Sequence, residues 1–261
     1  MSSPTVVVLI ACYNDEEYIR KSIESAFKQD YIGQLTICVI DDGSTDKSLD
    51  TARTFFTKEL SDTYKDQRVF FQENMGENGN IKYVVIQKPN GGPSDARNWG
   101  IGYTWPHAEV YAILDADDEM YENKISACVN VMSQDMSIIG VVYADYDTYH
   151  TETKKTIREF KEPYSRRRLL EECIIHSGSL ISKQALSDTQ EDTGFYDINM
   201  RTCEDYDLWM RISEKYVIAH VPESLTKVRI TGDNSSFVVN KSVWEQNWAR
   251  VRDKLHSRAN V

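Results

Sequence analysis

Apolar runs of strand length alternate with segments of helical periodicity over the first 120 residues of this chain. Runs at residues 5–12, 35–40, 82–87 and 110–114 are rich in β-branched and other apolar side chains, which predicts buried strands. Between them, apolar residues recur three or four positions apart, as on the inner face of a helix. Strands that are apolar almost throughout and alternate with helices predict an α/β fold, with a mostly parallel sheet flanked by helices.

The first of these helices is expected to begin at Asn14. Glu17 follows three residues later, which is the spacing of a capping box. Residues 60–82 interrupt the alternation with a polar segment rich in Gly and Asn. This segment predicts a hairpin loop, to which the sequence assigns no role.

The second half of the chain has a less regular pattern. Trp244, Trp248, Val251 and Leu255 form a stripe at helical spacing, which predicts a terminal helix packed on the core. Asp207 is expected to be a surface charge on a helix, and the basic run 166–168 a solvated helix face. The rest of the pattern predicts a strand or hairpin at 138–149, a helix at 166–172, a short strand at 178–181, a helix at 203–212 and an edge strand at 217–221.

Composition restricts the classes of protein to which the chain can belong. Hydrophobic residues make up 41% and charged residues 27% of the 261 positions, values typical of a globular protein. A formal net charge of −11 argues against broad binding to nucleic acid, and a phosphate-bearing ligand would need a local cation. Five scattered cysteines without CxxC spacing indicate buried, reduced thiols.

The sequence shows little sign of a membrane-spanning segment or of an export signal. The longest apolar run, residues 6–12, is far shorter than a membrane-spanning helix, and no basic residue precedes Arg20. These features predict a cytoplasmic protein, with peripheral membrane contact left open.

Three polar motifs follow three of the predicted strands. They read CYNDEE at 12–17, DDGSTD at 41–46 and DADDE at 115–119. In a parallel sheet the carboxyl ends of the strands meet at one edge, where ligands of such folds bind. The three motifs are therefore expected to lie together and to form a ligand site.

The acidic cluster at residues 115–119 has two interpretations when it is taken alone. One is a solvated turn at the start of a helix, where carboxylates are favoured. The other is a site for a divalent metal that is shared with the phosphates of a ligand. A calcium loop of the EF-hand type is excluded, because Met120 and Ser126 stand where its Gly and Glu are required.

Five motifs in a fixed order resemble the nucleotide-sugar glycosyltransferases of family two. They read VLIACYNDEEYI, VIDDGSTD, NGGPSDARNWGI, ILDADDEM and EDYDLWMRI, and together they span roughly residues 5–230. The resemblance implies the GT-A fold, with a Rossmann-like, mostly parallel central sheet and a smaller acceptor-side region. It also implies one glycosyltransferase domain at 1–240, with a nucleotide-sugar half at about 1–120 and an acceptor half at about 121–240, followed by a C-terminal helix at 241–261.

The resemblance implies nucleotide contacts for residues of the first two motifs. Ala11, Tyr13 and Glu16 match the loop that frames the base and ribose in the family. Asp41 matches the carboxylate that accepts a hydrogen bond from the base, and Asp42 stands beside it. An ionised carboxylate suits the N–H donor of a uracil-like base.

The next two motifs match the part of the family that binds the diphosphate and the sugar. Arg97 and the DxD motif, formed by Asp115, Ala116 and Asp117, are expected to contact the nucleotide-sugar. Asp117 or Asp118 would hold Mn²⁺ or Mg²⁺ against the diphosphate. For Arg97, a structural ion pair with a nearby carboxylate is the alternative.

The last motif matches the part of the family that supplies the catalytic base. By this resemblance Asp205 would take the proton of the acceptor hydroxyl as that oxygen attacks the sugar. Glu204 and His176 are minor candidates for the site. The family often carries Arg-x-His near the end of the domain, whereas this chain has Arg229 and then Thr231, which departs from the pattern.

The expected activity is metal-dependent, inverting transfer of a sugar from a nucleotide-diphosphate sugar to a hydroxyl of a glycan or other acceptor, with UDP as the first choice of nucleotide and dTDP as the next. Two alternatives stay open at this point. One is a noncatalytic protein that binds nucleotide-sugars or glycans. The other is a nucleotidyltransferase on a similar sheet, although ACYNDEE lacks the Gly-rich, Arg-bearing loop typical of that class.

Overall fold

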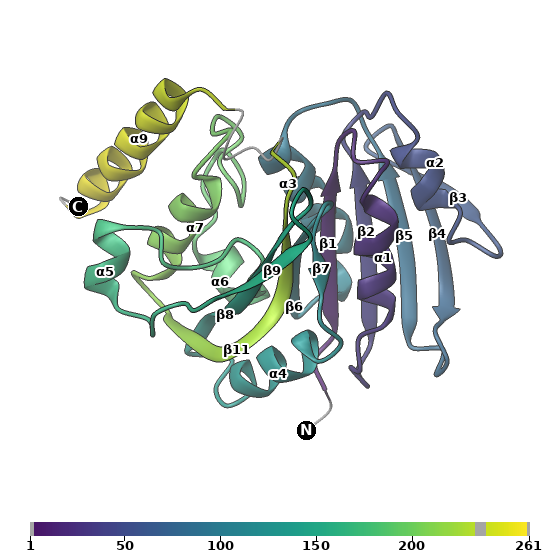
Figure 1. Ribbon diagram of the computed structural model, residues 1–261, viewed down its shortest axis with the longest axis horizontal. Coiled ribbons are helices and arrows are strands. Elements are labelled where there is room, and N and C mark those ends of the chain that lie inside the picture. The colour runs from purple at the N-terminus through teal and green to yellow at the C-terminus, as the bar shows by residue number, and fades with distance from the viewer. Residues whose placement is uncertain (1–2, 233–238, 260–261) are drawn as a thin grey trace.

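The computed structural model describes residues 3–232 and 239–259. Its centre is the parallel part of a mixed sheet (Figure 1). Strand β1 (Val6–Cys12) pairs with β2 (Leu35–Asp41) on one side and with β6 (Val110–Asp115) on the other, and β2 pairs with β5 (Ile81–Gln87). All four strands are buried almost throughout, which explains their continuously apolar sequence and confirms the four predicted strands.

The polar excursion at 60–82 contains a hairpin, as predicted. Strands β3 (Leu60–Tyr64) and β4 (Gln67–Met75) pair antiparallel, and β4 continues the sheet beyond β5. Lys65 and Asp66 form the turn, and both have positive φ, as a two-residue hairpin turn requires. Figure 1 shows this hairpin at the edge of the sheet remote from the C-terminal helix.

In the described part of the chain, the other half of the sheet combines two long strands with three short ones. Strand β10 (Leu180–Ser182) pairs antiparallel with both β6 and β8 (Ile139–His150), and β9 (Lys155–Glu159) forms a hairpin with β8. Strand β11 (Val217–Ile230) runs parallel to β8, and the two-residue strand β7 (Glu119–Met120) pairs with it.

The prediction of a short edge strand at 217–221 was wrong. Strand β11 has 14 residues and lies between β8 and β7. Its second half carries charged residues, among them Lys227 and Arg229, which pair with the acidic cluster instead of packing in an apolar core. For this reason the segment lacks the apolar run by which the central strands were predicted.

Helices cover both faces of the sheet (Figure 1). Side chains of α1, α2 and α4 pack into one hydrophobic cluster, and those of α3, α5, α6, α7 and α9 pack into the cluster on the other face. The stripe of Trp244, Trp248, Val251 and Leu255 lies in the second cluster, as predicted. The bounds are α1 (Ile19–Phe27), α2 (Ser48–Arg53), α3 (Pro93–Thr104), α4 (Lys124–Met132), α5 (Arg166–Glu171), α6 (Lys183–Asp188), α7 (Glu204–Ile212) and α9 (Lys241–Ala259), with a 3₁₀ turn η1 (Trp105–His107) after α3.

The predicted capping box at Asn14 does not form. Helix α1 begins at Ile19, and Asn14 has a φ of 57°, in the left-handed region. Its side-chain oxygen accepts a hydrogen bond from the backbone N–H of Thr45 at 2.8 Å. The Asn therefore joins the loop after β1 to the loop after β2, a tertiary contact that a local capping pattern could not reveal.

Asp207 is buried, contrary to the prediction of a surface charge. Its carboxylate pairs with Arg211 on the same helix at 2.9 Å and with Lys254 of α9 at 3.0 Å. The sequence spacing within α7 did not reveal this, because the second partner comes from a helix 47 positions further along the chain. The pair fixes α9 against α7.

The basic run at 166–168 lies on the exposed helix α5, where Arg168 pairs with surface glutamates, as expected for a solvated face. All five cysteines fall within the described residues and are free; four are buried and Cys173 is half-buried. None of the helices in the described part of the chain is long and apolar enough to cross a membrane.

Candidate active site

Strand register brings the predicted motifs to one edge of the sheet. Cys12 lies opposite Asp41, and Ala11 lies opposite Asp115, because β1 runs parallel to both of its neighbours. The loops after β1, β2 and β6 consequently meet above the centre of the sheet. The sequence predicted this meeting from the position of the motifs at strand ends.

The loops after β1 and β2 are joined by hydrogen bonds. The backbone N–H of Asp15 donates to Ser48 Oγ at 2.8 Å, and that of Glu16 donates to Asp46 Oδ2 at 3.0 Å. Glu16 also accepts from the backbone N–H of Lys47 at 2.9 Å, which gives its carboxylate a structural task. Tyr13, by contrast, is 49% exposed at the mouth of the site, where a nucleotide could pack on its ring.

The two neighbouring aspartates of the second motif have different surroundings. Asp42 accepts hydrogen bonds from the backbone N–H groups of Gly91 and Gly92 and forms a buried ion pair with Lys88. It thereby fixes the NGGP loop that precedes α3, and Lys88 is held on its other side by Asp95 at 2.7 Å. Asp42 is a positioning residue in this geometry.

Asp41 is 1% exposed, and neither of its carboxylate oxygens accepts a hydrogen bond of ordinary geometry from the residues that the structure describes. Burial raises the pKa of this carboxyl, while the hydroxyl and backbone N–H of the nearby Ser44 lower it. A buried carboxylate with so little hydrogen bonding is costly unless a ligand supplies a donor. Its position after β2 therefore fits a group that awaits an N–H donor.

Arg97 joins the two acidic motifs of the site. Its guanidinium donates to Asp115 Oδ1 at 2.9 Å and to Glu204 Oε1 at 2.6 Å, and it lies 5.4 Å from the centre of the Tyr196 ring. The residue is 6% exposed. Arg97 comes from α3, Asp115 from the end of β6 and Glu204 from the start of α7, so one side chain holds three elements in register.

Arg229 contacts three residues of the acidic cluster. Arg229 donates from its backbone to Asp118 Oδ1 and from its side chain to Glu119 Oε1 and to the carbonyl of Asp117. Asp118 is buried, and burial together with the charges of Asp117 and Asp115 raises its pKa well above the ordinary value. Asp117 is partly exposed, so the geometry favours Asp117 over Asp118 as the carboxylate that faces a ligand.

Sequence reasoning missed two residues next to this cluster. Lys124 is 1% exposed, donates to Thr226 Oγ1 at 2.6 Å, and has its pKa lowered to about 8 by burial. Ser177 Oγ donates to Asp115 Oδ2 at 3.3 Å. The signals were weak, since Lys124 is a single base six positions after Asp118 and Ser177 stands in an ordinary SGS turn.

His176 lies behind the site. Its ring stacks on Tyr146 with 4.5 Å between the ring centres, and its Nδ1 accepts from the backbone N–H of Gly178 at 3.2 Å. Burial, followed by the charges of Lys124 and Lys161, lowers its pKa to about 3. The imidazole is therefore neutral near pH 7 and supports the loop that carries Ser177.

Asp205 lies beside Glu204 at the first turn of α7, partly exposed. Burial, with the charge of Glu204 as the next cause, raises the pKa of Asp205 to about 7. Its Oδ1 accepts from the backbone N–H of Tyr206 at 2.7 Å. A carboxyl that titrates near neutral pH at the edge of a ligand site is the kind of group that acts as a general base.

Residues 7–189 match the family described as Glycosyl transferase family 2. This chain belongs to glycosyltransferase family 2. The matched segment contains Asp41, Arg97 and the DxD motif, and it ends before Glu204 and Asp205. The resemblance that the five motifs carried is confirmed at the level of the family.

Two relatives of this chain are named glycosyltransferase or synthase. An uncharacterized glycosyltransferase of Rickettsia typhi is 28% identical over 237 residues, covering 87% of this chain and 64% of that protein. The chondroitin synthase of Pasteurella multocida is 25% identical over 236 residues, covering 89% of this chain and 21% of that protein. The family 2 chain thus spans less than two thirds of either relative.

Solved structures share the fold. S. aureus TarS in complex with UDP-GlcNAc superimposes with a TM-score of 0.66 at 17% identity, over 92% of this chain and 64% of that chain. A mannosyltransferase from Pyrobaculum calidifontis in complex with GDP-Man and Mn²⁺ gives a TM-score of 0.60 at 15% identity, over 90% and 59%. The predicted GT-A fold is confirmed.

The family 2 site fits a divalent cation only in combination with a ligand. Among the described residues, no three His, Cys, Asp or Glu side chains converge in a way that could hold a metal ion by themselves. Mg²⁺ and similar ions are often bound by one or two carboxylates plus substrate phosphates, so a site built on Asp117 suits that mode. Thr231, which stands where the Arg-x-His pattern has its histidine, lies within the described residues and has no imidazole to offer a metal ion.

Proposed function

We propose that this chain is an inverting glycosyltransferase that moves a sugar from a UDP-sugar to a hydroxyl of a glycan acceptor. The observation that supports the proposal is the bridge from Arg97 to Asp115 and Glu204, because it joins the DxD motif, proposed to bind the donor, to the first turn of α7, which also carries the base candidate Asp205. Catalysis requires a base with a pKa near the working pH, as the raised pKa of Asp205 supplies, whereas binding alone does not require one.

The donor nucleotide is proposed from the surroundings of Asp41. Its buried carboxylate, which accepts no hydrogen bond of ordinary geometry from the described residues, would accept the N–H of uracil, while Tyr13 packs on the base or ribose. The UDP-GlcNAc complex of TarS supports a uridine donor. Because the mannosyltransferase was solved in complex with GDP-Man, a screen of donors should also include guanosine diphosphate sugars. In this scheme residues 1–120 bind the donor and residues 121–240 the acceptor.

Asp117 would hold a divalent cation together with the donor diphosphate, and Asp118, which accepts the Arg229 backbone N–H, would support it. When bound, the cation would neutralise charge on the departing diphosphate. Arg97 keeps Asp115 aimed toward the ribose or sugar.

The proposed chemistry is a single displacement. The acceptor hydroxyl oxygen forms a bond to the anomeric carbon as Asp205 takes the hydroxyl proton, and the bond from that carbon to the diphosphate oxygen breaks, so UDP leaves with the electron pair. Attack from the face opposite the leaving group inverts the anomeric configuration. Glu204 pairs with Arg97, and its charge, after burial, is the next cause that raises the pKa of Asp205 to about 7.

A screen of UDP-, dTDP- and GDP-sugars, each with and without Mn²⁺, tests the proposal. A true donor raises the melting temperature in a metal-dependent way, because a ligand of the native state stabilises it by mass action, and it also releases nucleotide slowly through hydrolysis. We expect UDP-sugars to give both signals. Stabilisation without turnover of any donor would favour the noncatalytic alternative, and stabilisation by GDP-sugars alone would refute the uridine assignment.

A further inference from the structure

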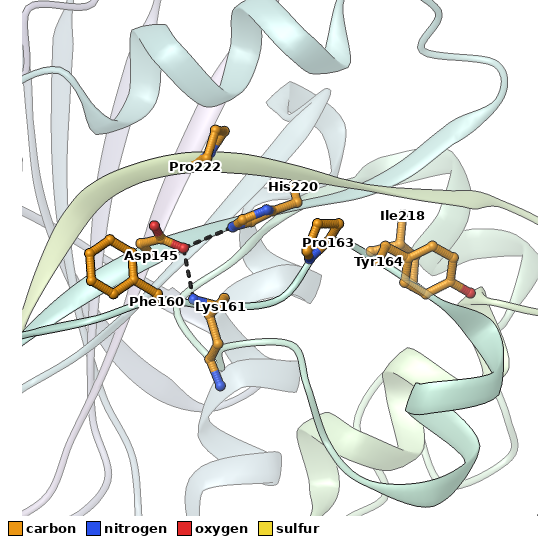
Figure 2. A pocket seen from close by; sticks show the side chains of 8 residues that line it. All are labelled: Asp145, Phe160, Lys161, Pro163, Tyr164, Ile218, His220 and Pro222. Atoms are coloured by element: carbon orange, nitrogen blue, oxygen red, sulfur yellow. Dashed lines mark hydrogen bonds and ion pairs between the residues drawn. The ribbon is translucent and has the colours of Figure 1, made fainter.

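A second pocket opens between β8, β11 and the segment that follows β9, apart from the residues assigned above (Figure 2). Its volume is about 660 Å³, within the range of pockets that bind small ligands. Asp145 and His220 form its polar floor, and Phe160, Tyr164 and Ile218 supply apolar walls. None of these residues has a task in the proposed chemistry.

Hydrogen bonds and ring stacking hold the side chains of the polar floor in place. One oxygen of Asp145 is left to accept a hydrogen bond from a ligand. Asp145 Oδ1 accepts from the backbone N–H of Lys161 and lies 2.9 Å from His220 Nε2. His220 is held in turn by stacking on Tyr143, with ring centres 4.8 Å apart. Asp145 is only 3% exposed, and no hydrogen bond from the part of the chain that the structure describes reaches its Oδ2.

The wall is apolar and open to solvent. Phe160 is 79% exposed, an unusual state for a large aromatic side chain beside a pocket. Figure 2 shows the Phe160 ring next to Asp145, whereas the Lys161 amine points away from that carboxylate. An aromatic face next to a carboxylate acceptor suits a sugar, because C–H groups of a pyranose pack on the ring while hydroxyls donate to the carboxylate.

The pocket is connected to the candidate active site by side-chain contacts. The Lys161 amine lies 5.5 Å from the centre of the Tyr146 ring, and Tyr146 stacks on His176. The next residue, Ser177, donates to Asp115. These contacts link the pocket to Asp115 through residues of the half of the chain that is proposed to bind the acceptor.

We propose that this pocket binds a neutral saccharide unit of the acceptor glycan, at a distance from the hydroxyl that is glycosylated. The inference rests on the proposed function for the identity of the acceptor, but the pocket and its chemistry stand on their own residues. A neutral unit is specified because the Asp145 carboxylate would repel a uronic acid, while the amine of Lys161, which also lines the pocket, points away from that carboxylate; the net charge of −11 adds to the repulsion. The acceptor is thus an oligosaccharide of at least two units.

Methyl NMR of the full chain tests the binding directly. We would follow the Ile218 methyl groups, which line the pocket, while lactose, chitobiose, maltotetraose or the acidic digalacturonate is added without donor. Ile32, which is 82% exposed and does not line the pocket, is the internal control. We expect at least one neutral saccharide to shift Ile218 in a saturable manner, with digalacturonate binding more weakly.

Two variants make the test specific. Phe160→Ala removes an exposed ring without opening the core, and it should weaken saccharide binding about tenfold. Ile157→Ala also truncates an exposed apolar side chain, on strand β9 just before Phe160, and should leave binding unchanged. Asp145→Asn keeps an acceptor for the Lys161 backbone and should reduce the discrimination against digalacturonate.

The proposal is overturned if no neutral saccharide shifts Ile218, or if Phe160→Ala binds as well as the wild type. A shift caused by an apolar probe such as anilinonaphthalene sulfonate, with none from saccharides, would instead mark a protein-docking surface. If the pocket does not bind saccharides, the release of nucleotide from the donor is still expected. If the chain does not catalyse the proposed transfer, the NMR shifts caused by saccharides are still expected, so the two outcomes are distinguishable.

Discussion

At the scale of single residues, the site solves a problem of charge. Asp115, Glu204 and Asp205 lie close together in a chain that is already acidic, and Arg97 is the buried cation that separates the first two. An arginine suits this position because its planar fork can bind two carboxylates at once, whereas a lysine presents one point charge. The bridge therefore fixes geometry as well as charge.

Arg97→Lys should lower the rate of transfer about 100-fold, because loss of one arm misplaces the DxD motif relative to the base. It should also lower the free energy of unfolding by about 1–3 kcal/mol, since a buried carboxylate loses its partner. The matched control is Arg53→Lys. Arg53 lies on α2 and forms a more exposed ion pair with Glu59, so this substitution should leave activity unchanged. Equal activity of Arg97→Lys and the wild type would contradict a positioning role.

Asp205 predicts opposite trends of activity and stability with pH. Burial and the charge of Glu204 raise its folded-state pKa to about 7, above its ordinary value of 3.8. Its contribution to stability is therefore complete below about pH 4 and is lost as pH rises through about 7, because the buried carboxyl must then ionise. Transfer requires the ionised base, so kcat/KM should rise with pH to a plateau above about 7.

Melting curves and initial rates from pH 5 to 9 measure both trends. Asp205→Asn cannot ionise, so the difference in unfolding free energy between it and the wild type should change across the same interval. A difference that stays constant with pH would show that Asp205 does not titrate there.

At the scale of elements, the site depends on loops that are fastened to one another. Asp42 fastens the NGGP loop by accepting two backbone N–H groups and a buried lysine amine. Asp46 fastens the loop after β1 from a more exposed position, accepting from the backbone of Glu16 and of Ser48. The two aspartates differ in burial, and this difference predicts different costs of removal.

Asp42→Ala should cost about 3–5 kcal/mol of unfolding free energy, because the buried Lys88 amine loses one of its two carboxylate partners and keeps only Asp95 and the Pro89 carbonyl. It should also weaken donor binding, since the loop that leads to Arg97 loses its support. Asp46→Ala should cost only about 1 kcal/mol. Chemical denaturation of the three proteins measures the costs, and equal losses for the two variants would refute the assigned role of Asp42.

The elements also show what the sequence could predict. Buried central strands are recognisable by their apolar runs, and their parallel order brings the motifs that follow them to one edge. The fold and the meeting of the loops after β1, β2 and β6 were therefore predictable. Strand β11 was predicted too short because half of its side chains serve the acidic cluster. Asn14 and Asp207 were misassigned because their partners lie far away in the sequence, and periodicity describes only neighbours on one element.

At the scale of the whole molecule, the proposed function requires an acidic protein to bind a diphosphate. The formal net charge is −11, and the diphosphate would enter beside the carboxylates of Asp115 and Asp117. Arg97 and Arg229 are both engaged with carboxylates of the protein. A divalent cation is therefore the proposed source of the missing positive charge.

Removal of divalent metal by EDTA should lower donor affinity at least about tenfold and abolish measurable transfer, because the diphosphate then meets uncompensated carboxylates. Uridine alone, which lacks phosphates, should bind equally well with and without metal. Calorimetry with UDP and with uridine separates the two contributions. Equal affinity for UDP under both conditions would contradict the proposed metal site.

The central claim is that Asp205 is the base of a transfer reaction at this edge of the sheet. The most direct test measures, on the same preparation, the binding of a UDP-sugar and the release of UDP for wild type, Asp205→Asn and the exposed control Asp253→Asn. We predict unchanged donor affinity in all three proteins, with turnover reduced at least about 1,000-fold in Asp205→Asn alone. Near-normal turnover by Asp205→Asn with intact donor binding would contradict the claim.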